Sequence, residues 1–97
     1  MRVIFADSAK ADLRYIALYI ARDSPVRARS FSKELRALCL TLADYPLRFP
    51  AFERSKSLRK CVHGNYLIFY RVLNGQVEII HILHGGIDLD DVPGFAN

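Results

Sequence analysis

Three histidines are the side chains of this sequence that most readily suggest catalysis or metal binding. His63, His81 and His84 could serve as general bases or as ligands of a metal ion. Side chains alternate along a strand, which predicts that His81 and His84 face opposite ways, and His63 lies before the preceding strand. The sequence therefore predicts structural or hydrogen-bonded histidines and no bound metal.

Motifs of the common enzyme classes are absent from the sequence. It contains no nucleophile elbow, phosphate-binding loop or pair of histidines on a helix, and Gly85-Gly86 is too short to cradle a phosphate. The two cysteines, Cys39 and Cys61, have neither metal-site spacing nor a disulfide framework, so we expect them to be small buried apolar side chains. These patterns predict no catalytic residue and no cofactor.

Tyrosines and basic side chains suggest a binding function instead. Tyr66 and Tyr70 lie on one strand face and could stack on bases, although strand tyrosines more often belong to a core or contact a partner. The net charge is +4, with basic side chains gathered between 54 and 60 and acidic ones between 88 and 91. Such a basic cluster is either a solvated surface or a docking patch for nucleic acid or an acidic protein.

A long β-hairpin positions several of these side chains. Two runs of β-branched and aromatic residues flank Asn74-Gly75, a dipeptide that suits a type I′ turn because both residues adopt positive φ at low cost. The turn sets a register with these facing residues: Leu73 and Gln76, Val72 and Val77, Arg71 and Glu78, Tyr70 and Ile79, Phe69 and Ile80, and Ile68 and His81. The opposite charges of Arg71 and Glu78 support this register.

Both faces of the predicted hairpin are mostly apolar. Alternation assigns Leu67, Phe69, Ile80 and Ile82 to one face, and Ile68, Tyr70, Ile79, His81 and Leu83 to the other. One face must be covered by other elements of the chain. The remaining face is expected to be exposed or given to a partner, because it is more apolar than the surface a monomer usually leaves open.

Two helices are expected before the hairpin. The first is predicted from about Ala9 to Ala21, with Asp7 or Ser8 as its N-cap. The second is predicted from about Pro25 to Ala43, because Ser24 is a favoured N-cap and proline is tolerated at the first helical position. Their apolar stripes consist of Leu13, Ile16, Ala17 and Ile20 on the first helix, and Ala28, Phe31, Leu35, Leu38 and Leu42 on the second.

The remaining elements complete the expected fold. A first strand is expected around Arg2 to Phe5, an irregular connection runs from Pro46 to about Ser57, and a strand from Leu58 to Val62 leads into the hairpin. The order β-α-α-β-β-β predicts an α+β domain over residues 1–97. In this domain a helical hairpin packs on one face of a small antiparallel sheet.

Length and hydropathy limit the architecture and the location. At 97 residues the chain suits one small domain with a single core. No apolar run approaches the roughly 20 residues of a membrane-spanning helix. The first residues lack the long apolar segment of a signal peptide, so we expect a cytoplasmic protein without membrane contact.

The order and spacing of these fragments resemble the ParE/RelE superfamily of bacterial toxins, and within it the ParE branch. The resemblance covers nearly the whole chain and is carried by these fragments: Asp12-Leu13, Ser24-Pro25, Leu58-Arg59, Ile68-Phe69-Tyr70-Arg71 and Ile80-His81-Ile82-Leu83-His84-Gly85. It implies a RelE/ParE-like fold and a toxin of a type II toxin-antitoxin system. It also implies a hetero-oligomer with a ParD-like antitoxin, through which the toxin contacts DNA only indirectly.

The resemblance implies two possible targets. RelE-type relatives cleave mRNA on the ribosome, whereas ParE-type relatives are understood to poison DNA gyrase without cutting RNA. RNA cleavage needs cations to stabilise the phosphoryl transition state and a group to move the 2′-OH proton. RNA-cleaving relatives place arginines at the positions that hold Leu67 and Ile87 in this sequence. We therefore expect a non-enzymatic toxin that inhibits gyrase by direct binding.

Two alternatives stay open beside this hypothesis. One is a ribosome-dependent endoribonuclease of the RelE type that uses Arg59, His81 or His84. The other is a non-toxic protein that still binds an antitoxin, because many ParE relatives carry arginine at the positions of His81 and Ile87. The candidate contacts to the target or the antitoxin are Arg59, Tyr66, Tyr70, Arg71, His81, His84 and Asp88. We expect the antitoxin to bind helix faces and a sheet edge.

Overall fold

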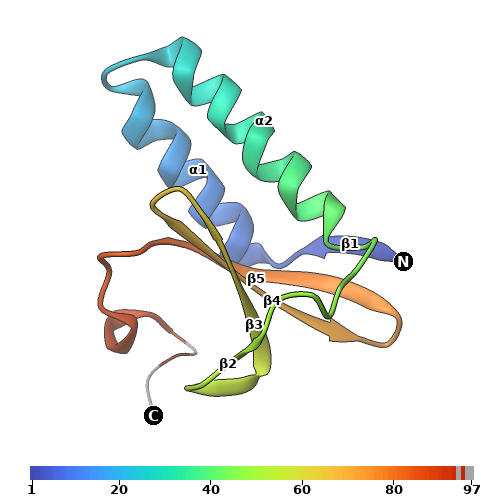
Figure 1. The fold of residues 1–97 in the computed structure, drawn as a ribbon. Helices are drawn as coiled ribbons and strands as arrows, with labels where there is room; N and C mark the ends of the chain where they lie inside the picture. The colour runs from blue at the N-terminus through green and yellow to red at the C-terminus, as the bar shows by residue number, and fades with distance from the viewer. Residues whose placement is uncertain (94, 96–97) are drawn as a thin grey trace.

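The computed structural model describes residues 1–93 and residue 95, and it contains two helices and a mixed five-stranded sheet (Figure 1). Along the chain the elements are β1 (Arg2–Phe5), α1 (Asp7–Ala21), α2 (Pro25–Thr41), β2 (Ala51–Phe52), β3 (Ser55–His63), β4 (Tyr66–Leu73), β5 (Gln76–His84) and a 3-10 helix, η1 (Leu89–Asp91). The strand order is β1-β5-β4-β3-β2. The predicted α+β fold is therefore confirmed.

One strand differs from the predicted antiparallel arrangement. β2, β3, β4 and β5 pair antiparallel, whereas β1 lies parallel to β5 at the edge of the sheet. Both helices and three strands separate β1 from β5 along the chain, and a long connection of this kind permits parallel pairing. β2 is an additional strand of two residues inside the connection that was expected to be irregular.

The two helices begin differently. The Ser24 hydroxyl accepts a hydrogen bond from the N–H of Arg27 at 3.1 Å, so the predicted N-cap of α2 is confirmed. α1 begins at Asp7 after Ala6, and the described residues provide no side-chain cap. The predicted capping by Asp7 or Ser8 is wrong, because the Ser8 hydroxyl donates instead to the carbonyl of Ile80 at 2.5 Å.

The hairpin turn is confirmed and the register is confirmed for its first half. Asn74 and Gly75 have φ of 54° and 71°, as a type I′ turn requires. Pairing follows the prediction from Leu73 and Gln76 to Tyr70 and Ile79. Farther from the turn, Phe69 pairs with His81 and Ile68 pairs with Ile82, so the last two predicted pairs are wrong. A β-bulge inserts one extra residue into β5 and shifts everything beyond it.

The bulge also changes which face several side chains occupy. Ile82 packs in the core beneath the helices with Ile68 and Ile79, and Leu83 packs on the opposite face with Phe69. The predicted faces of these two residues are therefore exchanged. His81 faces Phe69 across the strands, instead of sharing a face with Tyr70 as predicted.

The second face of the sheet is covered by the chain's own C-terminal segment. Val92 and Phe95 are buried there against Phe69, and in Figure 1 this segment lies away from the helices. The guanidinium of Arg54 pairs with the carboxylate of Asp90 and donates to the carbonyl of Phe95 at 3.3 Å. The expectation of an exposed or partner-covered face is wrong, because sequence alternation in the strands says nothing about a distant tail.

The remaining core lies between the helices and the sheet. It consists of Ala9, Leu13, Ile16, Phe31, Leu35, Cys39, Leu42, Cys61, Ile68, Tyr70, Val77, Ile79 and Ile82. Both cysteines are buried as predicted, and burial raises the pKa of the Cys39 thiol to about 12. Within the described part of the chain, no helix is long and apolar enough to cross a membrane.

Candidate functional site

Helix α1 takes the place of a neighbouring strand along the second half of β5. β1 pairs only with residues 76–79, so the outer edge of β5 beyond Ile79 has no strand beside it in the described structure. The Ser8 hydroxyl donates to the carbonyl of Ile80, and Oδ2 of Asp12 accepts from the N–H of Ile82 at 2.9 Å. Ser8 and Asp12 lie on one helix face because they are four residues apart. Side chains thus satisfy backbone groups that a strand would otherwise pair.

The same carboxylate oxygen holds the buried histidine of the bulge. Nδ1 of His81 donates to Oδ2 of Asp12 at 2.7 Å, and the side chain of His81 lies against the ring of Phe95. His81 is 9% exposed, which leaves little of it available to a substrate or a partner. One oxygen of Asp12 therefore joins the helix, the bulge and the strand edge, and His81 is a hydrogen-bonded histidine as predicted.

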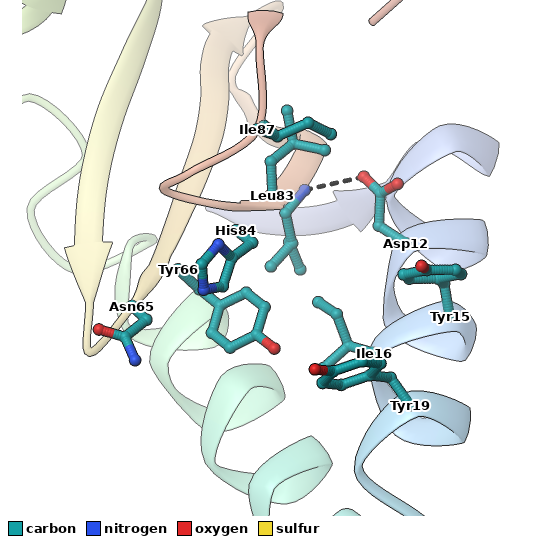
Figure 2. Close-up of a pocket in the computed structure, with 10 residues that line it drawn as sticks. Asp12, Tyr15, Ile16, Tyr19, Asn65, Tyr66, Leu83, His84 and Ile87 are labelled. Carbon is teal, nitrogen blue, oxygen red and sulfur yellow. Dashed lines mark hydrogen bonds between the residues drawn. The ribbon is translucent and has the colours of Figure 1, made fainter. Parts of the chain in front are cut away.

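A groove opens beside this junction, between α1 and the ends of β4 and β5 (Figure 2). We call it the tyrosine groove; its volume is about 560 Å³. Its lining residues are Asp12, Tyr15, Ile16, Tyr19, Asn65, Tyr66, Ile82, Leu83, His84 and Ile87. Figure 2 shows Tyr15 and Tyr19 on α1 across the groove from Tyr66 and His84. The two helix tyrosines are 73% and 58% exposed, so they contribute little to the core.

Tyr66 and His84 form the opposite wall of the tyrosine groove. The ring of Tyr66 packs against Phe31 at 5.3 Å and meets the ring of His84 edge-on at 5.5 Å. Nδ1 of His84 accepts a hydrogen bond from the N–H of Gly86 at 3.1 Å, which fixes the imidazole over the turn after β5. Burial, together with the nearby phenols of Tyr19 and Tyr15, raises the pKa of Tyr66. Its hydroxyl is therefore neutral at physiological pH.

The charge of the tyrosine groove is unusual for this chain. The protein carries a net charge of +4, yet none of the ten described lining residues is a lysine or an arginine. The carboxylate of Asp12 is the acidic group among them. The groove therefore combines the electron-rich faces of three tyrosines with one carboxylate, an arrangement that attracts cations.

A second groove lies between the two helices. We call it the helix groove; it is lined by Ala17, Leu18, Ala21, Pro25, Ala28, Arg29, Ser32 and Lys33, and its volume is about 470 Å³. Leu18 is largely exposed although it is apolar. Arg29 and Lys33 are exposed, and no acidic residue belongs to the lining. The helix groove is therefore apolar with a basic margin.

The structure brings two of the seven predicted contact residues, Tyr66 and His84, into the tyrosine groove. Arg59 lies on β3, where its guanidinium donates to the carbonyls of Leu47 at 3.3 Å and Phe49 at 2.5 Å. It therefore holds the connection between α2 and β2 in place.

The other predicted contact residues are dispersed. Tyr70 is completely buried and donates to the carbonyl of Pro46 at 2.7 Å. Arg71 pairs with Glu78 at 2.7 Å, as the register predicted. Oδ1 of Asp88 accepts from the N–H of Asp90 at 3.0 Å and caps η1. Together with the buried His81, these residues lie outside both grooves.

The residues that α1 contributes to the tyrosine groove were not predicted from the sequence. Asp12, Tyr15 and Tyr19 all lie outside the apolar stripe of the helix. Two tyrosines four residues apart on the exposed side of a helix were a usable signal, because they form one aromatic strip. For metal binding, residues 1–93 and 95 contain no cluster of three His, Cys, Asp or Glu side chains that could hold an ion.

Comparison with known proteins identifies relatives over most of the chain. The family model of the ParE toxin of the type II toxin-antitoxin system, parDE, matches residues 3–89. The chain is 36% identical over 78 residues to Toxin ParE1 of Caulobacter vibrioides, covering 78% of the chain and 80% of the relative. It is 34% identical over 84 residues to Toxin RelE2 of the same organism, covering 86% and 93% respectively.

Solved structures share the fold at lower identity. The chromosomal ParDE toxin-antitoxin system from P. aeruginosa contains a chain with a TM-score of 0.74 and 17% identity, covering 87% of this chain and 95% of that one. The toxin-antitoxin complex RelBE2 from Mycobacterium tuberculosis gives a TM-score of 0.65 and 22% identity, covering 86% and 95%. Both similarities concern the arrangement of the helices and the sheet.

Proposed function

Because the chain belongs to the ParE toxin family of type II toxin-antitoxin systems, we propose that it inhibits DNA gyrase by direct binding and is neutralised by a ParD-like antitoxin. The family match over residues 3–89 is the observation that carries this function. A cytoplasmic location is part of the proposal, because gyrase acts on DNA in that compartment.

The arginine and histidine side chains that could serve a ribonuclease are occupied by other contacts, which supports a non-enzymatic toxin. A ribonuclease needs cations free to face a phosphate in the transition state. Arg59 donates to two backbone carbonyls and Arg71 pairs with Glu78. His81 is buried against Asp12, and His84 lies apart from it in the tyrosine groove. The groups that a ribonuclease would use are thus bound elsewhere or separated.

The test for a gyrase inhibitor uses the purified chain and purified gyrase. Supercoiling of relaxed plasmid should be inhibited, or cleaved DNA complexes should accumulate, at a modest molar excess of the toxin. Prior mixing with the antitoxin should restore supercoiling, which controls for nonspecific inhibition. Unchanged supercoiling at a large molar excess would exclude this target.

The helix groove supports an antitoxin that binds through an amphipathic helix. Most of its lining residues are apolar, and the exposed Arg29 and Lys33 supply positive charge. An apolar helix face flanked by acidic residues fits such a groove. The product of the adjacent gene should co-purify with the chain as a stable complex, and its failure to do so would exclude that product as the antitoxin.

An endoribonuclease is the second candidate, because the chain is 34% identical to a relative named Toxin RelE2 over 86% of its length. Primer extension on translated mRNA separates the two functions. New cleavage ends that appear when the toxin is induced would support the ribonuclease. Their absence, together with inhibited supercoiling, would support the gyrase inhibitor.

A further inference from the structure

We propose that the tyrosine groove binds an extended segment of the antitoxin that presents an arginine or lysine side chain. The identity of the partner rests on the proposed function, whereas the chemistry of the groove does not. This contact is separate from the helix groove, whose basic margin suits an acidic helix.

The preference for a cation follows from the lining of the groove. Ring faces of tyrosine attract ammonium and guanidinium groups, and Tyr15, Tyr19 and Tyr66 supply such faces from two elements. Oδ2 of Asp12 already accepts from Ile82 and His81, but Oδ1 accepts no hydrogen bond from the residues that the structure describes. A guanidinium could therefore stack on a tyrosine and donate to this second oxygen.

The preference for an extended segment follows from the edge of β5. Along a strand, the N–H and C=O groups of successive residues point to alternate sides. The N–H of Ile82 points outward to Asp12, so the carbonyl of Ile82 and the N–H of His84 also lie on the outer edge. Both residues line the groove. Main-chain groups of an extended partner can pair with such an edge.

The same lining argues against nucleic acid. Tyrosine rings stack on bases, but binding to a nucleic-acid strand also depends on lysine and arginine side chains that neutralise phosphates. None of the described lining residues supplies such a cation, and the carboxylate of Asp12 would repel a phosphate. A basic peptide is therefore favoured over RNA or single-stranded DNA. A groove of about 560 Å³ accommodates several side chains of such a peptide.

Tyrosine fluorescence reports directly on this groove. The chain has no tryptophan and five tyrosines, of which Tyr15, Tyr19 and Tyr66 line the groove. The probe is a blocked peptide of alternating threonine and arginine, compared with peptides in which citrulline or glutamate replaces arginine. The arginine peptide should bind about tenfold more tightly than the uncharged citrulline peptide, and the glutamate peptide most weakly. Equal affinities for arginine and citrulline would overturn the inference, as would tighter binding of oligouridylate.

Exposed tyrosines provide matched variants. Tyr15→Ala and Tyr19→Ala should each weaken binding of the arginine peptide about threefold to fivefold. Tyr45→Ala is the control, because Tyr45 is 71% exposed, as Tyr15 is at 73%, and it lies outside the groove. Circular dichroism should show that all three variants remain folded. An equal loss of affinity in the control would overturn the inference.

Protection of Tyr15 and Tyr19 from nitration in the purified toxin-antitoxin complex tests whether the antitoxin occupies the tyrosine groove. Nitration by tetranitromethane should modify Tyr15 and Tyr19 at least fivefold more slowly in the complex than in the free chain. The nitration rate at Tyr45 should stay the same.

If the antitoxin neutralises the toxin while Tyr15 and Tyr19 remain fully reactive, this inference fails and the proposed function stands. If gyrase is unaffected but the arginine peptide and the protection behave as expected, the gyrase target fails and the groove assignment stands.

Discussion

The tyrosine groove and the helix groove both lie along α1, yet they are built from different interactions. Beside the tyrosine groove runs the outer edge of β5, where Ser8 and Asp12 bond the carbonyl of Ile80 and the N–H of Ile82. The helix groove lies between the two helices and is lined mostly by apolar side chains, and its charged residues are Arg29 and Lys33. The first groove depends on hydrogen bonds and the second on packing. Substitutions that damage one should therefore spare the other.

The two grooves also differ in charge. The charged residue of the tyrosine groove is Asp12, and those of the helix groove are Arg29 and Lys33. One helix thus presents an acidic aromatic surface and a basic aliphatic surface. A partner that carries an acidic helix and a basic extended segment could occupy both and could not exchange the two. Under the proposed contacts, this difference would set the orientation of the bound antitoxin.

Replacing Asp12 with alanine should have the largest effect and should disturb the tyrosine groove alone. The substitution leaves the N–H of Ile82 and Nδ1 of His81 without their acceptor in a largely buried place. Leaving such groups unpaired costs about 2 to 3 kcal/mol of the free energy of unfolding. Urea denaturation of the two proteins measures this loss.

Two further variants calibrate that measurement. Ser8→Ala removes one donor from the carbonyl of Ile80 and should cost about 1 kcal/mol. Asp23→Ala changes an exposed carboxylate that makes no side-chain hydrogen bond to the described residues, so it should alter stability by less than about 0.5 kcal/mol. A loss for Asp12→Ala no greater than for Asp23→Ala would contradict the role given to Asp12.

Reversing the charges of the helix groove should weaken antitoxin binding and leave stability almost unchanged. Arg29→Glu combined with Lys33→Glu places acidic groups against the acidic helix of the proposed partner. We expect the dissociation constant of the complex to rise about tenfold at low salt, and less at high salt because ions screen exposed charges. Lys10→Glu with Lys56→Glu changes the same number of exposed charges outside the grooves and serves as the control. Similar weakening by both pairs would mean that net charge, rather than the helix groove, governs binding.

Tyr66→Phe should have the smallest effect, which becomes visible at alkaline pH. Burial raises the pKa of Tyr66 in the folded protein, so folding favours the neutral phenol. This contribution to stability is complete below the unfolded pKa of about 10 and is lost as pH rises through the higher folded pKa. The variant cannot ionise there, so its free energy of unfolding should fall less between pH 8 and pH 11. Tyr45→Phe should follow the parent protein, and a Tyr66→Phe profile identical to that of the parent would refute this expectation.

Sequence signals that act over only a few residues correctly predicted the hairpin turn and the N-cap of α2. Asn74-Gly75 produced the expected turn, and Ser24 capped α2 as expected. Both depend on neighbouring residues alone, so one short segment contains all the information. The pairing of Arg71 with Glu78 follows from the same turn.

Features that depend on distant residues were not predictable from these patterns. The bulge in β5 coincides with contacts from Asp12, which is 70 positions away from Ile82 along the chain. Strand alternation contains no sign of such a partner, so Ile82 and Leu83 were assigned to the wrong faces. Phe95 covers the second face of the sheet from a segment that has no periodic pattern. The tyrosine groove was missed for the same reason, because it joins α1 to the far end of the hairpin.

Helix α1 uses different residues to hold the strand edge and to present an exposed aromatic surface, which suggests how related toxins in one cell could acquire separate partners. Ser8 and Asp12 hold the strand edge, whereas Tyr15 and Tyr19 project from the exposed side of the same helix. Under the proposed antitoxin contact, substitutions at the two tyrosines would alter partner preference at almost no cost in stability, because both side chains are largely exposed. Gene duplication followed by drift at these two positions could therefore insulate one toxin-antitoxin pair from another while the fold is inherited unchanged.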